Sequence, residues 1–469
     1  MPNTKQSTTA RADTEVRRLA RFVHGVVYED LAESARTALK IRILDALGCA
    51  IGALGAPPLR ALRELVESLG GAPSATLIGG GSTSPDRAAL YNGALARYLD
   101  FNDAFLAPHE TCHPSDNLGA VLAAAEHAGA TGRRLLTALA TAYAVQCRLS
   151  EAAPVRARGF DHTTQGAYAA AAGAAHALDL SQEQTANAIA ISGTANNALR
   201  VTRTGRLSNW KGLAYPNTGM NALLAALFAA HGITGPLEVF EGNKGFMETI
   251  AGHYSISWTP AALRAVERTS LKRFNAEIHA QSAIEGILDL RRAHAVTGAQ
   301  IESIEVGTFD VARNIIGGGE EGEKYTVTTK EEADHSLPYM LAAALLDGEL
   351  TPRQYLPERI ARADVQSLLR RVRVVADPAL SKRFPAQMPA RLAVVLADGR
   401  TLRVEKDDYA GFYTRPMRWE QAAEKFHALA APHADEATLR EIVQTVADLE
   451  QHRVRELTNL LQHVKEQTR

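Results

Sequence analysis

The segment from Asp100 to Asn117 gathers side chains that are suited to proton transfer. Its acids and imidazoles are Asp100, Asp103, Glu110, Asp116, His109 and His113. Histidine has the unperturbed pKa nearest to neutrality, so it can accept or release a proton during a reaction. Because alanine-rich helical patterns flank the segment, we expect a loop that carries acid–base chemistry. The competing interpretation is a solvated polar loop in which Ser115 or Asp116 only caps the next helix.

Two more polar positions lie beside helical patterns. His162 follows Asp161 and precedes Thr163, either of which could cap a helix while His162 is merely exposed. Lys211 precedes a turn rich in Gly, Pro and Asn. It is either an ordinary surface lysine or the cation that fixes a carboxylate near a helix start.

A dense polar run follows the first long helical region, at Lys272, Arg273, Glu277, His279 and Gln281. We expect a domain junction there, and such junctions favour small-molecule sites. Linker polarity is the competing explanation. Further along, Tyr339 precedes an apolar helical pattern; most such tyrosines are structural, but a phenol could also donate a proton into a cleft.

Composition excludes several classes of function. The 469 residues include 51 basic and 52 acidic side chains and carry a formal net charge of −1, so no global field attracts nucleic acid or an anionic membrane. Any anionic ligand must be held by local charges. Gly79–Gly81 lacks a Walker lysine, and Gly317–Gly319 runs into acids, so nucleotide binding is disfavoured.

Metal and membrane signals are equally weak. The cysteines, Cys49, Cys112 and Cys147, have spacings that match neither zinc nor iron–sulfur ligation, so we expect no metal and no disulfide frame. The stretch between Lys211 and Glu238 contains an apolar core of only about ten residues, too short to cross a bilayer. Residues 1–12 are polar and lack the apolar region of a secretory signal. We therefore expect a soluble, cytoplasmic protein.

Apolar spacing predicts a helical first part. Leu19, Phe22, Val23 and Val26 recur at helical intervals, and a helix should begin at Pro57 and stop at Gly70. After residue 268 the pattern becomes mixed, with a hairpin signal at Asp398-Gly399 between two strand-like runs. The chain then returns to helical spacing. We predict a mainly α fold: a large all-helical domain, residues 1–268 and 406–469, with a smaller α+β lid, residues 269–405, inserted before the C-terminal helices.

Several motifs together resemble the MmgE/PrpD family. They are Leu99–Asp103, His113–Asn117, Gly159–Thr163, Ser208–Gly212, Glu277–Ser282 and Ala333–Tyr339, in that order along the chain. That family contains 2-methylcitrate dehydratases and cis-aconitate decarboxylases. The His113–Asn117 and Glu277–Gln281 motifs are more similar to those of the dehydratases.

The resemblance implies an active site in a cleft between the domains of a homodimeric enzyme. Carried over by position, the catalytic residues would be Asp100, His113, His162 and Tyr339, and the substrate-binding residues would be Lys211, Lys272 and His279. The chain departs from the dehydratases at Ala104, where they carry Thr, and over residues 108–112 and 213–219. These departures bear on the identity of the substrate.

The implied chemistry suits these residue types. Dehydrating a 2-hydroxy tricarboxylate requires a base, an acid and cations near several carboxylates. His113, oriented by Asp100, would move the proton, and His162 or Tyr339 would protonate the leaving hydroxyl. We expect a cofactor-free hydro-lyase acting on 2-methylcitrate or a close tricarboxylate. The alternatives are a decarboxylase or an isomerase/epimerase of a related small polycarboxylate, and a helical binding protein that has lost turnover.

Overall fold

Helices build most of the chain before residue 269, as the apolar spacing predicts. The computed structural model describes residues 13–466, so the polar start at residues 1–12 lies outside the described part. In the first helix, Leu19 and Val23 are completely buried, and the predicted helix after Pro57 ends at Leu69. The helices are α1 (Glu15–Gly25), α2 (Glu33–Gly52), α3 (Pro57–Leu69), α4 (Pro85–Tyr98), α5 (Leu118–His127), α6 (Gly132–Ala152), α7 (Thr163–Ala177), α8 (Gln182–Ala195) and α9 (Trp210–Ala230).

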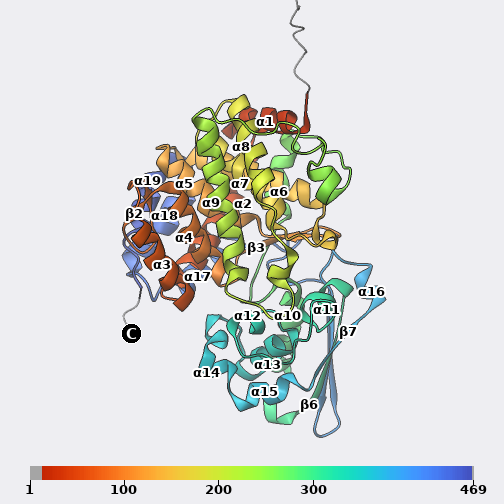
Figure 1. Ribbon diagram of the computed structural model, residues 1–469. Helices are drawn as coiled ribbons and strands as arrows, with labels where there is room; N and C mark the ends of the chain where they lie inside the picture. Colours follow the sequence, from red (N-terminus) through yellow and green to blue (C-terminus); the bar gives the residue numbers. More distant parts are fainter. Residues whose placement is uncertain (1–12, 467–469) are drawn as a thin grey trace, which may run out of the picture.

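The last helices of the chain return to this part. Figure 1 shows α17 (Trp419–Ala430), α18 (Glu436–Ala447) and α19 (Val454–Leu461) beside α2, α3 and α4. Phe426 of α17 is completely buried, and its Cα would lie 3.1 Å from a Cβ placed on Gly48 of α2. Residues from the two ends of the chain therefore form one hydrophobic core.

Small residues allow these helices to approach closely. A Cβ on Gly119 of α5 would lie only 2.7 Å from the Cα of Gly93 on α4, so a larger residue does not fit. A Cβ on Gly93 would in turn lie 3.5 Å from Cβ of Pro216. Pro216 lies inside α9, so the turn expected after Lys211 is wrong: the helix starts at Trp210 and continues through the proline. Packing against Gly93 offsets the helix penalty of proline.

The second part is a four-stranded sheet with helices packed on it. The strand order is β7 (Val372–Ala376), β6 (Ile301–Thr308), β8 (Ala390–Leu396), β9 (Thr401–Lys406); β6 and β7 are parallel and the other pairs antiparallel. The predicted hairpin is β8–β9, and Gly399 supplies the positive φ of 85° that its turn needs. The helices are α10 (Gln281–His294), α11 (Asp310–Ile316), α12 (Lys330–Ala333), α13 (Leu337–Asp347), α14 (Pro357–Ile360), α15 (Ala363–Leu369) and α16 (Pro378–Ser381).

The Asp100–Asn117 segment connects the two parts. It contains β3 (Asp103–Leu106) and β4 (Thr111–Cys112), and β3 also pairs with β5 (Ser270–Leu271) at the junction. The remaining two strands, β1 (Ala75–Thr76) and β2 (Ser82–Thr83), form a separate pair. The expected loop is therefore a short sheet, which sets Asp100 beside the start of the second part.

The fold class is confirmed as mainly α with a smaller α+β part. One hydrophobic core joins the helices of the first part to α17, α18 and α19, and a second joins the four-stranded sheet to α10 and α13. The second core also includes Tyr409 and Phe412, beyond residue 405. The domain boundaries, 1–268 with 406–469 and 269–405, remain a prediction. Among residues 13–466, no helix is both long enough and apolar enough to cross a bilayer.

Candidate active site

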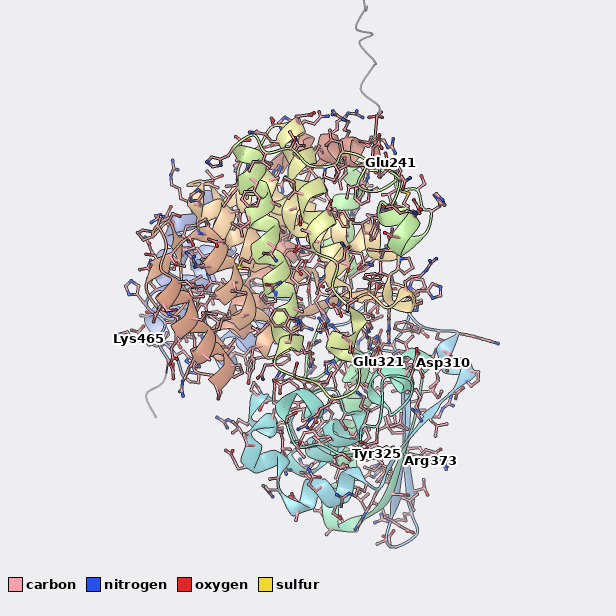
Figure 2. All side chains as sticks on the ribbon, viewed as in Figure 1. Glu241, Asp310, Glu321, Tyr325, Arg373 and Lys465 are labelled. Carbon is pink, nitrogen blue, oxygen red and sulfur yellow. The ribbon has the colours of Figure 1, made fainter. Side chains whose placement is uncertain are left out.

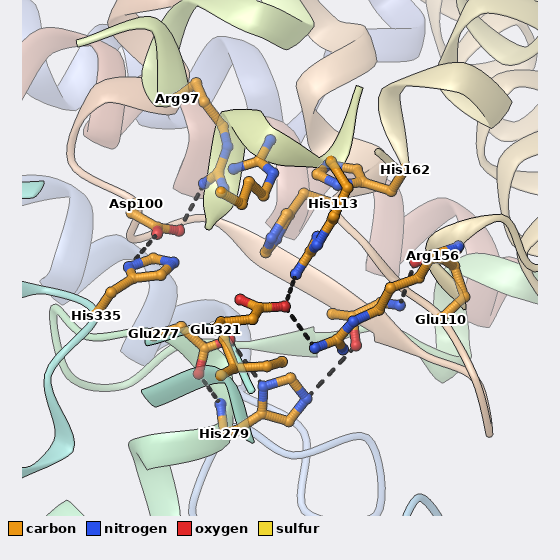
Figure 3. A pocket seen from close by; sticks show the side chains of 14 residues that line it. Arg97, Asp100, Glu110, His113, Arg156, His162, Glu277, His279, Glu321 and His335 are labelled. Carbon is orange, nitrogen blue, oxygen red and sulfur yellow. Dashed lines mark hydrogen bonds and ion pairs between the residues drawn. The ribbon is translucent and has the colours of Figure 1, made fainter. Parts of the chain in front are cut away.

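A polar cavity lies where the two parts meet (Figure 3). Its lining residues are Arg97, Asp100, Glu110, Thr111, His113, Arg156, His162, Arg200, Arg203, Glu277, His279, Ile315, Glu321 and His335. The set includes Asp100, His113, His162 and His279 of the predicted residues but not Lys211, Lys272 or Tyr339. The solvated-loop interpretation of the first motif is wrong, because Asp100 and His113 are buried.

Asp100 is the centre of a buried ion network. Its carboxylate accepts hydrogen bonds from Arg97 at 2.6 Å and Lys272 at 2.5 Å, and Lys211 Nζ lies 3.4 Å away. Burial alone would raise the pKa of Asp100, but Arg97, Lys272 and Lys211 outweigh it and hold this pKa well below its usual range. The backbone of Asp100 has a φ of 53°, an uncommon conformation that the surrounding ion pairs hold in place.

His113 is held by the backbone rather than by Asp100. Its Nδ1 donates to the carbonyl of Asp103 at 2.7 Å, so the expected pairing with the Asp100 carboxylate is not what the structure contains. This bond fixes the tautomer and leaves the lone pair of the neutral ring on Nε2. Burial, together with the positive charges of Arg97 and Lys272, places the pKa of His113 well below its usual value. His113 is therefore a neutral imidazole that lines the cavity.

His162 lies edge-on to His113, with ring centroids 5.4 Å apart. Its Nδ1 is 3.1 Å from Asp161, which also pairs with Arg203 at 2.6 Å. Burial lowers the pKa of His162 to about 4, more strongly than Asp161 raises it. The interpretation of His162 as an exposed residue is wrong, and the ring is a second neutral imidazole.

His279 enters the cavity from the second part of the chain. It belongs to the short 3₁₀ turn Ile278–Ala280, whose N-cap is Glu277. The Glu277 carboxylate accepts from the backbone N–H of His279 at 2.7 Å and lies 2.8 Å from its Nδ1. Burial would raise the pKa of Glu277, but its hydrogen bonds and charge interactions with His279 and Lys272 lower it to about 2. An ionised carboxylate therefore accompanies the imidazole at neutral pH.

Lys211 and Lys272 lie behind the cavity wall. Lys211 Nζ is 2.6 Å from Asp334 and 2.9 Å from His335 Nδ1. Burial lowers the pKa of Lys211 despite these partners. Oxygen and nitrogen atoms of Asp100, Asp334 and His335 lie within 4.8 Å of one another, as in a metal site. The Lys211 ammonium contacts all three residues, so it already supplies the positive charge that a metal ion would bring there.

Tyr339 lies away from the cavity. The side chain is completely buried in the second core, and its hydroxyl donates to the carbonyl of Gln354. Burial raises the pKa of Tyr339 above its usual value. A phenol engaged in this way supports packing of α13 and is poorly placed to protonate a ligand.

Arginines and one glutamate complete the cavity. Sequence reasoning did not select Arg97, Arg156, Arg200, Arg203, Glu321 or His335. Arg156 and Arg200 both contact the carboxylate of Glu321, which comes from the second part. The sequence signal for these arginines is weak. Arg200 and Arg203 lie three residues apart after an alanine-rich helix, but this spacing does not predict which residues they contact.

The departures from the dehydratase pattern fall in different places. Ala104 is buried in β3 and belongs to the second core, and it does not line the cavity. Tyr215, from the altered stretch after Lys211, stacks on His162 with centroids 6.1 Å apart. Its hydroxyl donates to Asn117 at 2.9 Å. The departure over residues 213–219 therefore touches a site residue, and the departure over residues 108–112 includes Glu110 and Thr111, which line the cavity.

Sequence comparison agrees with this architecture. The MmgE/PrpD N-terminal domain matches residues 17–259, and the MmgE/PrpD C-terminal domain matches residues 274–451. The chain is 30% identical to a 2-methylcitrate dehydratase of Cupriavidus necator, over 77% of this chain and 78% of the relative. It is 28% identical to the 2-methylcitrate dehydratase of Escherichia coli K12, over 76% and 77%.

A more distant relative is cis-aconitate decarboxylase of Mus musculus, 24% identical over 92% of this chain and 90% of the relative. The named relatives are lyases of both the dehydratase and the decarboxylase kind. Since the two family matches together span most of residues 17–451, this chain belongs to the MmgE/PrpD family and is a lyase.

Proposed function

We propose that this lyase is a hydro-lyase that dehydrates 2-methylcitrate or a closely related tricarboxylate, using side chains alone. The dehydratase names of the relatives and the polar, cationic character of the cavity support this proposal. The observation that carries it is the pair of imidazoles on facing sides of the cavity, His113 and His279 (Figure 3). An elimination needs a base and an acid arranged in this way.

His113 is the proposed base. Its Nε2 would take the proton alpha to a carboxylate, because Nδ1 already donates to Asp103. Arg97 and Lys272 lower the pKa of His113, and the negative charges of a bound tricarboxylate would offset them. Arg97, which lines the cavity, would also stabilise the negative charge that develops on the substrate. His113 would therefore become a stronger base when substrate binds.

His279 is the proposed acid for the leaving hydroxyl. An imidazolium at His279 would be paired with the ionised Glu277, 2.8 Å from its Nδ1. His279 replaces His162 and Tyr339, the two residues that the sequence suggests as the acid. His162, with a pKa of about 4, is neutral near pH 7 and a poor proton donor, and Tyr339 is bonded to Gln354.

The test is a panel of citrate-like acids followed by product NMR. We expect 2-methylcitrate, or another tricarboxylate with a hydroxyl group, to lose water and give an alkene without loss of carbon dioxide. The panel is run before and after dialysis against a chelator, and turnover should be the same. Release of carbon dioxide from an unsaturated acid would instead assign a decarboxylase, and activity that needed added metal would overturn the side-chain mechanism. The family resemblance also favours a homodimer, which light scattering tests.

A further inference from the structure

Glu321 bridges the two parts of the chain at the cavity. It follows α11, and Figure 2 shows it at the boundary between the second part and the helical part. One carboxylate oxygen lies 2.7 Å from Arg156 and 2.5 Å from Arg200, both in the helical part. The Glu321 side chain is only 5% exposed. Two guanidinium groups thus converge on one oxygen of a carboxylate.

Several buried polar atoms around this carboxylate are unsatisfied. Among the described residues, none provides a hydrogen-bond partner for Oε2 of Glu321, Nε of Arg200, Nη2 of Arg203 or Nε2 of His162. All four side chains line the same cavity. Two of these atoms, Nε of Arg200 and Nη2 of Arg203, are donors, and buried donors without partners are uncommon in proteins, so the two together indicate a site built for a polar acceptor. Guanidinium donors suit a carboxylate, which accepts bidentate hydrogen bonds.

The other cations near the cavity are already engaged. Lys272 and Arg97 pair with Asp100, and Lys211 pairs with Asp334. Arg156 and Arg200, in contrast, form their ion pairs with Glu321. Arg200 also lies 3.6 Å from the carboxylate of Asp161. The arginines, rather than the lysines expected from the sequence, are therefore the cations that can exchange an internal carboxylate for one from a ligand.

The free volume of the cavity also indicates that a ligand carboxylate must replace an internal one. Its free volume is about 30 Å³, room for about two water molecules and far too little for a tricarboxylate. A ligand of that size must displace a side chain or separate the two parts. Glu321 has the charge of the incoming group and, unlike the carboxylates of Asp100, Glu110 and Glu277 in the same cavity, it pairs with Arg156 and Arg200.

We propose that Arg156 and Arg200, with Arg203 beside them, bind one carboxylate of the substrate, and that Glu321 occupies this subsite until the substrate carboxylate displaces it. The inference rests on the proposed function for the identity of the ligand as a tricarboxylate. An internal group that competes for the subsite lowers the apparent affinity for the ligand. Removing the charge of Glu321 should therefore tighten binding.

Binding of tricarballylate by calorimetry tests the proposal without turnover, since this tricarboxylate has no hydroxyl to lose. Glu321→Gln should tighten binding by about 10- to 100-fold, the range expected when a charge-assisted hydrogen bond no longer has to be broken. Glu320→Gln, an exposed neighbour, is the matched control and should bind like the parent. Unchanged or weaker binding by Glu321→Gln would overturn the displacement.

The subsite itself is tested by removing an arginine. Arg200→Gln should weaken tricarballylate binding by about 10- to 100-fold, while glutarate, which lacks the third carboxylate, should lose much less. Exposed Arg206→Gln serves as the control. If Arg200→Gln does not fold, the double variant with Glu321→Gln removes both halves of the ion pair, and it should bind tricarballylate about 10- to 100-fold more weakly than Glu321→Gln alone. Equal losses for both ligands, or no loss, would contradict the assignment. Because these are binding measurements, they can succeed even if the NMR panel finds no dehydration.

Discussion

The ammonium of Lys272 and the carboxylate of Asp100 join the two parts of the chain directly: Nζ lies 2.5 Å from Oδ1 and 2.7 Å from the backbone carbonyl, although 172 residues separate them. Both side chains are buried. Asp100 lines the cavity and Lys272 lies behind it, and the pair fixes β5 and the following residues against the end of α4. The Asp100–Asn117 segment, which the sequence suggests as an active-site loop, therefore also holds the two parts of the chain together.

Asp100→Asn should destabilise the fold as well as lower turnover. The change leaves Lys272 and Arg97 with an uncompensated buried charge, and breaking a buried pair costs about 3–5 kcal/mol of unfolding free energy. Strain from the backbone does not contribute, because Asn tolerates the positive φ at this position. Asp310→Asn, at an exposed acid, should cost less than about 1 kcal/mol. Chemical denaturation measures both; equal stability of the two variants would show that the network contributes nothing.

His162 should make the protein sensitive to acid. Its folded pKa is about 4 and its unfolded value about 6.5, so only the unfolded state takes up the proton between these values. Stability should fall as the pH drops from 6.5 to 4, by about 3 kcal/mol for this group. His162→Gln should lose that part of the pH dependence, as measured by denaturation at pH 7 and pH 4.5.

His176 provides a matched control for the acid sensitivity. It lies at the opposite end of α7 from His162, buried between the carbonyl of Val23 and the hydroxyl of Thr137, and its pKa is also lowered to about 4 by burial. His176→Gln should reduce the acid sensitivity to a similar extent and keep turnover per folded molecule. If His162→Gln retained the full pH dependence of the parent, the buried neutral state of His162 would be contradicted.

Glu277 and His279 should act as one unit. Glu277→Gln and His279→Gln should each lower turnover by about 10²–10⁴-fold, as for loss of a general acid. The double variant should lose little more than either single variant, because residues that act together are strongly non-additive. Thermal unfolding checks that all three remain folded. Multiplied losses in the double variant would mean that the carboxylate does not work through His279.

Local patterns predicted much of the fold. The apolar spacing around Leu19 and Val23 gives α1, and the Asp398-Gly399 turn gives the β8–β9 hairpin, because both depend on residues close in sequence. The turn after Lys211 was mispredicted because tertiary packing of Pro216 against Gly93 overrides its local preference. Strand β3 in the Asp100–Asn117 segment also pairs with Ser270 and Leu271, and no local signal reveals that pairing.

The candidate site was predicted in part for a related reason. Residues rich in acid–base chemistry, such as His113 and His279, can be selected by type and motif. The ion pair between Arg200 and Glu321 spans 121 residues, and neither side chain is unusual in its own segment. Likewise, His113 donates to a backbone carbonyl, and the types of the residues in the sequence do not predict a hydrogen bond to the backbone. Partners distant in the chain require the three-dimensional fold.

The most direct test of the account is the turnover of His113→Gln on the best substrate from the NMR panel. His109→Gln, an exposed histidine of the same segment, is the control. If His113 is the base, its variant should keep tricarballylate binding and a near-parental melting temperature while turnover falls by about 10²–10⁴-fold, and the control should match the parent. Near-parental turnover of a folded His113→Gln protein would contradict the mechanism and pass the proton-transfer role to His162.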